Sequence, residues 1–218
     1  MPSFFFGTAT NTRIHRRSRL KTRLKSYILL ASFLAAGKRK EALVAMKKGL
    51  ESGVMKQRAV GELLLHLSLL LGFPLMLEGL AMLRSITGKS DSTVPKKLTA
   101  MEIRRRGMKV MDRVYGKTLD RLLVNVKALH RSAPDLIIRE AYGRIIGRPG
   151  LSLRDREILN VAVLTIQQLD QQLYSHIRGA LRLHVSPSDL RAAILLASKV
   201  AGRNPSLSLH LLASLAKT

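Results

Sequence analysis

The chain has 218 residues, of which 38 are Lys or Arg and 14 are Asp or Glu, so its formal net charge at pH 7 is +24. It contains no cysteine, which excludes disulfides, thiolate zinc sites, iron–sulfur clusters and thiol redox chemistry. Hydrophobic residues make up 46% of the chain, enough for a folded core, whereas 4% aromatic residues argues against a base-stacking platform for single strands.

The positive charge is concentrated in an N-terminal arm, residues 1–25, and in the middle of the chain. A surface this basic predicts a polyanionic partner, because binding releases condensed counterions. We expect RNA first, within a larger assembly such as a ribosome, with DNA, an anionic membrane surface or an acidic protein as alternatives. The expected phosphate contacts are Arg13, Arg16, Arg17, Arg19, Lys21, Arg23, Lys25, Arg104, Arg105 and Arg106. The arm is also typical of a mitochondrial transit peptide. As part of such an assembly, the protein is expected in the mitochondrial matrix or in a bacterial cytoplasm.

Apolar residues recur at helical spacing almost throughout, which predicts an all-α protein. In the first half we expect helices at 26–36, 40–51, 56–71 and 74–83, and a polar linker at 88–97. The most apolar run, Leu63 to Leu77, has roughly 15 residues, fewer than the roughly 20 that a bilayer span requires. The sequence therefore predicts no transmembrane segment.

The second half has clearer helix boundaries. We expect a long basic helix, or a broken pair, at 100–126, a short helix at about 133–141, and further helices at 157–167 and 171–183. A helix capped by Ser186 and a last helix after Pro205 complete the chain. Ser152 with Asp155, like Ser186 with Asp189, has the spacing of an N-terminal cap.

The pattern of the first half returns in the second half at an offset of about 130 residues. Residues 50–83 run parallel to residues 180–215, with Gly49 aligned to Gly179 and Gly72 to Gly202. This repetition predicts a tandem duplication. The boundaries that we expect are a basic arm at 1–25, a diverged first half at 26–88, a basic linker at 89–110 and a second half at 111–218.

Three segments of the second half carry a resemblance to a known family. They are Tyr142-Gly143, the stretch RPGLSLRDRE from Arg148 to Glu157, and the stretch HIRGAL from His176 to Leu181. In this order they resemble the carboxymuconolactone decarboxylase / alkylhydroperoxidase-D-like family, over residues 111–215. The resemblance implies an all-α fold that typically forms homo-oligomers, with the first half as a diverged second copy.

The resemblance also implies which residues would act. Glu157 and His176 hold the outer positions of the peroxidase signature, but Leu169 and Gln172 stand where that signature has cysteines, so peroxidase activity is excluded. The decarboxylase branch implies an acid/base pair of Glu157 and His176, with Arg148 or Arg178 holding a substrate carboxylate. We expect no cofactor and no metal, because the histidines lack ligand spacing.

Two functions stay open at this point. The first is a non-enzymatic member of the fold, a pseudoenzyme that binds RNA as a structural component, in which Glu157 only favours the start of a helix and His176 fills a hydrogen-bonding position. In the first half the aligned residues are about Tyr27 and Met46, which form no acid/base pair. The alternative is a cofactor-free lyase that uses Glu157 and His176.

Overall fold

The computed structural model describes residues 20–89 and 97–216, and all regular structure within these two ranges is helical. The prediction of an all-α fold is confirmed. Four of the expected phosphate-binding residues, Arg13, Arg16, Arg17 and Arg19, lie outside the described residues.

The first half consists of α1 (Thr22–Ala35), α2 (Arg39–Glu51) and α3 (Gln57–Thr87). The two helices expected on either side of Gly72 are the two arms of α3, which is interrupted there because Gly72 has a φ of +81°. A left-handed φ suits glycine, and Pro74 two residues later cannot continue the hydrogen-bond ladder. By length and composition α3 could span a membrane, but core helices pass the same test.

A capping box between Thr99 and Glu102 starts α4 (Ala100–Tyr115), which begins within the segment predicted as a basic linker at 89–110. The predicted basic helix at 100–126 is a broken pair. It bends at Gly116 through the short helix η1 (Gly116–Thr118) into α5 (Leu119–Leu129). Next, α6 (Ala133–Leu136) continues as the π-helix η2 (Ile137–Ile146).

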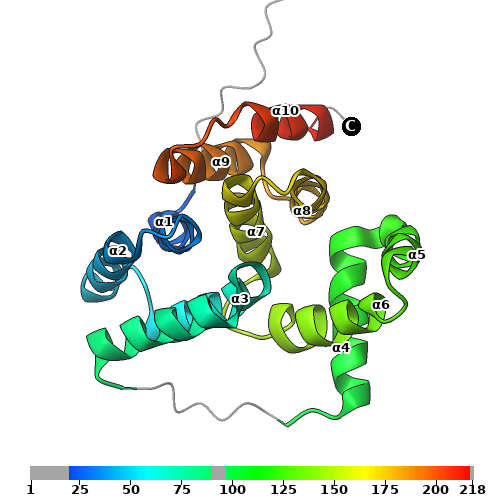
Figure 1. Ribbon diagram of the computed structural model, residues 1–218, viewed down its shortest axis with the longest axis horizontal. Helices are drawn as coiled ribbons and strands as arrows, with labels where there is room; N and C mark the ends of the chain where they lie inside the picture. Colours follow the sequence, from blue (N-terminus) through cyan, green and yellow to red (C-terminus); the bar gives the residue numbers. More distant parts are fainter. Residues whose placement is uncertain (1–19, 90–96, 217–218) are drawn as a thin grey trace, which may run out of the picture.

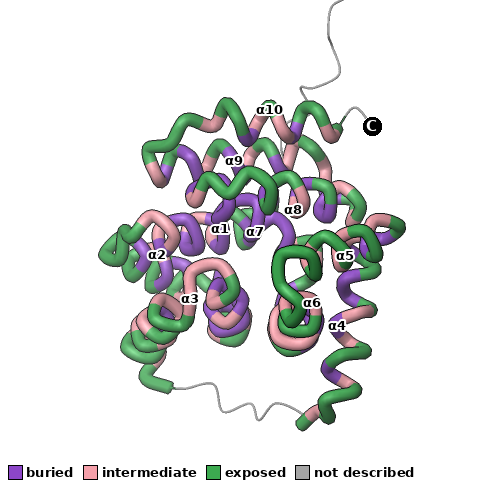
Figure 2. Tube along the Cα trace, turned by 45° about the vertical axis from the view of Figure 1, so that its right-hand side comes forward, coloured by how far each residue is buried: buried purple, intermediate pink, exposed green. Residues whose placement is uncertain are grey.

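The remaining helices are α7 (Leu153–Gln167), α8 (Asp170–Arg182), α9 (Pro187–Ala201) and α10 (Ser206–Leu215). The predicted caps are confirmed, since Ser152 and Ser186 accept hydrogen bonds from the backbone N–H groups of Asp155 and Asp189. Helix α7 stands at the centre and packs against α1, α8 and α9 (Figure 1). Every residue from Arg156 to Ile166 is buried, so this helix carries polar groups into the core (Figure 2).

Helices α4 and η2 cross at very short range. A Cβ added to Gly107 would lie 2.0 Å from the backbone oxygen of Ile138, and one added to Gly143 would lie 2.6 Å from the backbone oxygen of Ile103. The two backbones are therefore in direct contact through their glycines. This contact holds Tyr142 of η2 against Tyr115 at the end of α4.

The backbone repeats between the halves in the way that a duplication predicts. Left-handed φ values at Gly37, Gly53 and Gly72 recur at Gln168, His184 and Gly202. Buried Ala42, Met46 and Gly49 of α2 correspond to buried Leu173, Ile177 and Ala180 of α8. In this register the offset within α2 and α8 is 131 residues, which aligns Gly49 with Ala180 instead of Gly179. The duplication itself stays a prediction.

The glycine contact between α4 and η2 gives a first testable prediction. Gly107→Ala would force apart two backbones, which we expect to lower the free energy of unfolding by about 3 kcal/mol or more. Gly61→Ala is the matched control, because its added Cβ has Leu83 Cδ2 as nearest neighbour at 4.0 Å. We expect the control to be stabilised by about 0.5–1 kcal/mol, as for other helix glycines. Equal stability of the two variants in urea unfolding would contradict the close crossing.

Candidate functional site

Glu157 lies in the second turn of the central helix α7, and its side chain has no exposed surface. Ser152 caps this helix, so Glu157 is not its cap. The carboxylate turns towards α8, where its Oε2 lies 2.8 Å from Nδ1 of His176. One turn further along α8, a Cβ added to Gly179 would lie 2.7 Å from Val114 Cγ1 and 3.1 Å from the same Oε2. The missing side chain of Gly179 thus gives room both to Val114 of α4 and to the carboxylate beside the histidine.

His176 retains 15% of its side-chain exposure, whereas Glu157 is fully buried. Because Nδ1–H donates to the carboxylate, the ring presents Nε2 as its basic nitrogen, and the carboxylate stabilises the imidazolium when that nitrogen takes up a proton. This is the arrangement of an oriented general acid/base. The two predicted catalytic residues are therefore brought together.

Asn160 connects this pair to the first half of the chain. Its Nδ2 lies 3.3 Å from Glu157 Oε1, and its Oδ1 lies 2.8 Å from Nε2 of His66 on α3. A carboxylate only accepts hydrogen bonds, so the amide nitrogen of Asn160 faces it and the amide oxygen accepts from His66 Nε2–H. Burial, together with the charge of Arg156, lowers the pKa of His66 to about 3, so the ring is neutral at physiological pH.

Two tyrosines lie close enough to the carboxylate to feel its charge. The hydroxyl groups of Tyr115 and Tyr142 are hydrogen-bonded to each other, and the rings meet edge to face. Burial raises the pKa of both phenols, and the charge of Glu157 raises it further. Both therefore stay protonated and can act as hydrogen-bond donors.

A cavity of about 630 Å³ opens between the α4–α5 corner and α8. Tyr115 and Gly179 form part of its wall, whereas Glu157 and His176 do not line it; the Glu157 carboxylate lies next to Gly179. Four cations also line it: Lys117, Arg121, Arg178 and Arg182. Arg178, predicted to hold a substrate carboxylate, lies with its guanidinium 6.0 Å from the ring centroid of Tyr174. A concave site with four positive side chains favours a small ligand with more than one negative charge.

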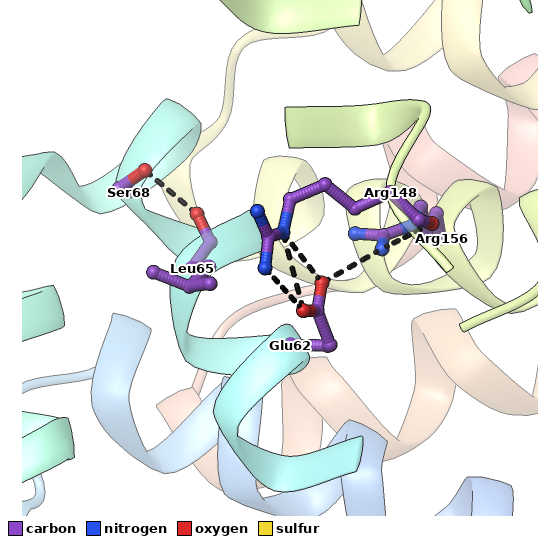
Figure 3. A network of polar contacts seen from close by, with 5 residues as sticks. All are labelled: Glu62, Leu65, Ser68, Arg148 and Arg156. Atoms are coloured by element: carbon purple, nitrogen blue, oxygen red, sulfur yellow. Dashed lines mark hydrogen bonds and ion pairs between the residues drawn. The ribbon is translucent and has the colours of Figure 1, made fainter. Parts of the chain in front are cut away.

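Arg148, the other arginine predicted to bind a substrate carboxylate, is not in the wall of this cavity. Its Nε and Nη2 bind both oxygens of Glu62 from α3, at 2.7–3.1 Å. The Glu62 carboxylate also lies 3.5 Å from Nη2 of Arg156, which is completely buried (Figure 3). Arg148 thus recognises a carboxylate of its own chain, and the substrate role predicted for it is not favoured by this placement.

Three of the six described residues of the expected phosphate-binding set already contact groups of the chain. Arg23 is 3.4 Å from Asp155, Arg104 is 2.9 Å from Asp135, and Arg106 donates to the backbone oxygen of Gly143. All of these six except Arg106 are exposed. Binding of RNA or another polyanion stays a prediction that rests on the net charge.

Several residues of the site were not predicted from the sequence. Lys117, Arg121 and Arg182 are three of them. Arg121 follows Lys117, and Arg182 follows the predicted Arg178, at i,i+4 spacing, so the two pairs could have been read as a candidate anion site. Asn160 follows Glu157 by three residues, which also places it on the same face. Nothing in the sequence indicates that His66 reaches them, because that contact joins residues 94 positions apart.

Comparisons with known proteins agree with the position of the site. The model of the carboxymuconolactone decarboxylase family matches residues 136–208. The 4-carboxymuconolactone decarboxylase of Acinetobacter baylyi is 30% identical over 99 residues, which are 45% of this chain and 74% of that protein. The nitrosuccinic acid decarboxylase of Metarhizium robertsii is 31% identical over 106 residues, 46% of this chain and 74% of that protein.

The Glu62 ion pairs give a prediction for stability. Replacement of the carboxylate in Glu62→Gln leaves the charge of Arg156 buried without its partner, and we expect the free energy of unfolding to fall by about 3–5 kcal/mol. Glu78→Gln removes the partner of Arg39 in a far more exposed pair, so this control should lose less than about 1 kcal/mol. Similar losses in both variants, measured by urea unfolding, would contradict the role of Glu62.

His66 gives a prediction for pH dependence. Unfolded His66 takes up a proton below its ordinary pKa of 6.5, whereas the folded protein resists protonation down to a pKa of about 3. Because the unfolded chain binds this proton more readily, the free energy of unfolding falls as the pH drops from 6.5 towards 3. Between pH 7 and pH 5, we expect the wild-type chain to lose about 2 kcal/mol more than His66→Gln. Parallel stability curves for the two proteins would show that His66 is not buried in its neutral form.

Proposed function

The chain belongs to the carboxymuconolactone decarboxylase family, and from that premise we propose that it is a cofactor-free decarboxylase of a small substrate with more than one anionic group. The observation that carries the proposal is the Glu157–His176 pair, held at 2.8 Å beside a cavity wall with four cations. Both relatives named above are decarboxylases. Of the two functions left open by the sequence, the lyase is the one that these features support.

The four cations would bind and orient the substrate. A cation on the departing carboxylate stabilises the ground state and opposes its loss, so Arg178 and its neighbours favour the reaction when they hold the carboxylate that remains. The same cations also favour the reaction if they hold the substrate oxygen on which negative charge develops. The substrate class that fits is therefore a di- or polycarboxylate with an electron-withdrawing group next to the carboxylate that leaves.

The reaction needs one proton. The C–C bond to the departing carboxylate breaks, CO2 leaves, and the electron pair moves onto the adjacent electron-withdrawing group. The substrate carbon then takes a proton from Nε2–H of the His176 imidazolium, which Glu157 stabilises through Nδ1. His176 recovers its proton from solvent, to which it is partly exposed.

Tyr115 would act on the charge that develops during this step. It lines the cavity, and its raised pKa keeps its proton in place. When Tyr142 donates to the Tyr115 oxygen, the Tyr115 proton is left to point into the cavity and stabilise an enolate-type oxygen.

The experiment measures CO2 release from a panel of small di- and monocarboxylates, 4-carboxymuconolactone included. We expect turnover of one or more dicarboxylates, with kcat lowered about 10²- to 10⁴-fold by His176→Ala. His210→Ala is the matched control, because His210 is an exposed histidine of α10 and should leave kcat unchanged. Arg178→Ala should mainly raise KM. Full activity of the His176 variant, or no turnover of any carboxylate, would overturn the proposal.

A further inference from the structure

The first half of the chain supplies a side chain to a site whose other members all lie in the second half. His66 extends from α3, has no exposed surface, and lies 2.8 Å from Asn160 Oδ1 through its Nε2. Asn160 in turn contacts both members of the acid/base pair, 3.3 Å from Glu157 Oε1 and 3.2 Å from His176 Nδ1. A continuous path of polar contacts therefore leads from α3 to the pair.

The Glu157 carboxylate sets the direction of each hydrogen bond in this path, because it can only accept. The Glu157 carboxylate accepts from His176 Nδ1–H and from Asn160 Nδ2–H, which leaves the Asn160 oxygen facing α3. A reversed amide would place its oxygen against the carboxylate, and the repulsion of the two oxygens would displace Glu157. With its proton on Nε2, His66 donates to the Asn160 oxygen and opposes this reversal, because a reversed amide would set its own N–H group against the His66 N–H.

We propose that His66 is a positioning residue of the proposed decarboxylase, which fixes the amide of Asn160 so that Glu157 and His176 keep their geometry. This inference rests on the proposed function and adds that the active site is shared between the two halves of the chain. The first half then has a part in the reaction although its own aligned positions carry no acid/base pair. His66 acts through Asn160 and does not touch the substrate.

The kinetic test compares three variants of the full chain. His66→Leu removes the donor and should lower kcat about 10- to 100-fold, with KM changed less than about twofold. His66→Gln keeps an amide donor and should restore most of the lost kcat. Leu67→Ala is the control for a general loss of stability, because Leu67 is its buried neighbour on α3, and kcat should stay near the wild-type value. Equal kcat for His66→Leu and wild type would overturn the proposal.

A double-mutant cycle tests whether His66 acts through Asn160. If it does, His66→Leu combined with Asn160→Ala lowers kcat no further than Asn160→Ala alone. Effects that multiply would mean that His66 acts independently, and the proposal would fail.

A measurement that needs no activity separates this inference from the proposed function. The titration of the His176 imidazole, followed by NMR, should shift by a resolvable amount in His66→Leu and stay near the wild-type curve in His66→Gln. An unchanged curve in His66→Leu overturns the positioning role, even in an active enzyme. A shifted curve supports it, even if no carboxylate is turned over.

Discussion

The buried carboxylate of Glu157 is the constraint on which the rest of the site depends. A carboxylate without water is tolerated only when its oxygens are hydrogen-bonded, and here His176 and Asn160 provide those bonds. Each neighbouring feature serves the same requirement. Gly179 leaves the space that the carboxylate occupies, and His66 keeps the amide of Asn160 turned the right way. The negative charge also helps to keep Tyr115 protonated.

Polar contacts at the central helix α7 join the two halves of the chain. His66 contacts Asn160, and one turn earlier on α3 the Glu62 carboxylate contacts Arg156 and Arg148. Because both contacts are buried or nearly so, they fix the position of α3 more strictly than apolar packing alone. They also explain why Arg178 lines the cavity whereas Arg148 does not. Glu62 already occupies Arg148, whereas Arg178 extends along α8 into the wall of the cavity.

Much of the fold could be predicted from local sequence, because helix periodicity and caps such as Ser152 and Ser186 depend on neighbouring residues. Glu157, His176 and Arg178 could be proposed because they lie in segments that resemble a known family. Asn160 could have been placed on the face of Glu157 by its spacing, but its contact with His66 could not be assigned, since it depends on α3 packing against α7. The net charge of +24 was less informative, because charge alone does not distinguish an RNA from a small anion.

A structure with a bound, unreactive dicarboxylate such as succinate tests the central claim most directly, because that claim links the cationic cavity to the Glu157–His176 pair. The account predicts one carboxylate at Arg178 and Arg182, and the other end of the molecule within hydrogen-bond reach of His176 Nε2 or Tyr115. A dicarboxylate that binds outside the cavity, or inside it but out of reach of both His176 and Tyr115, would contradict the account.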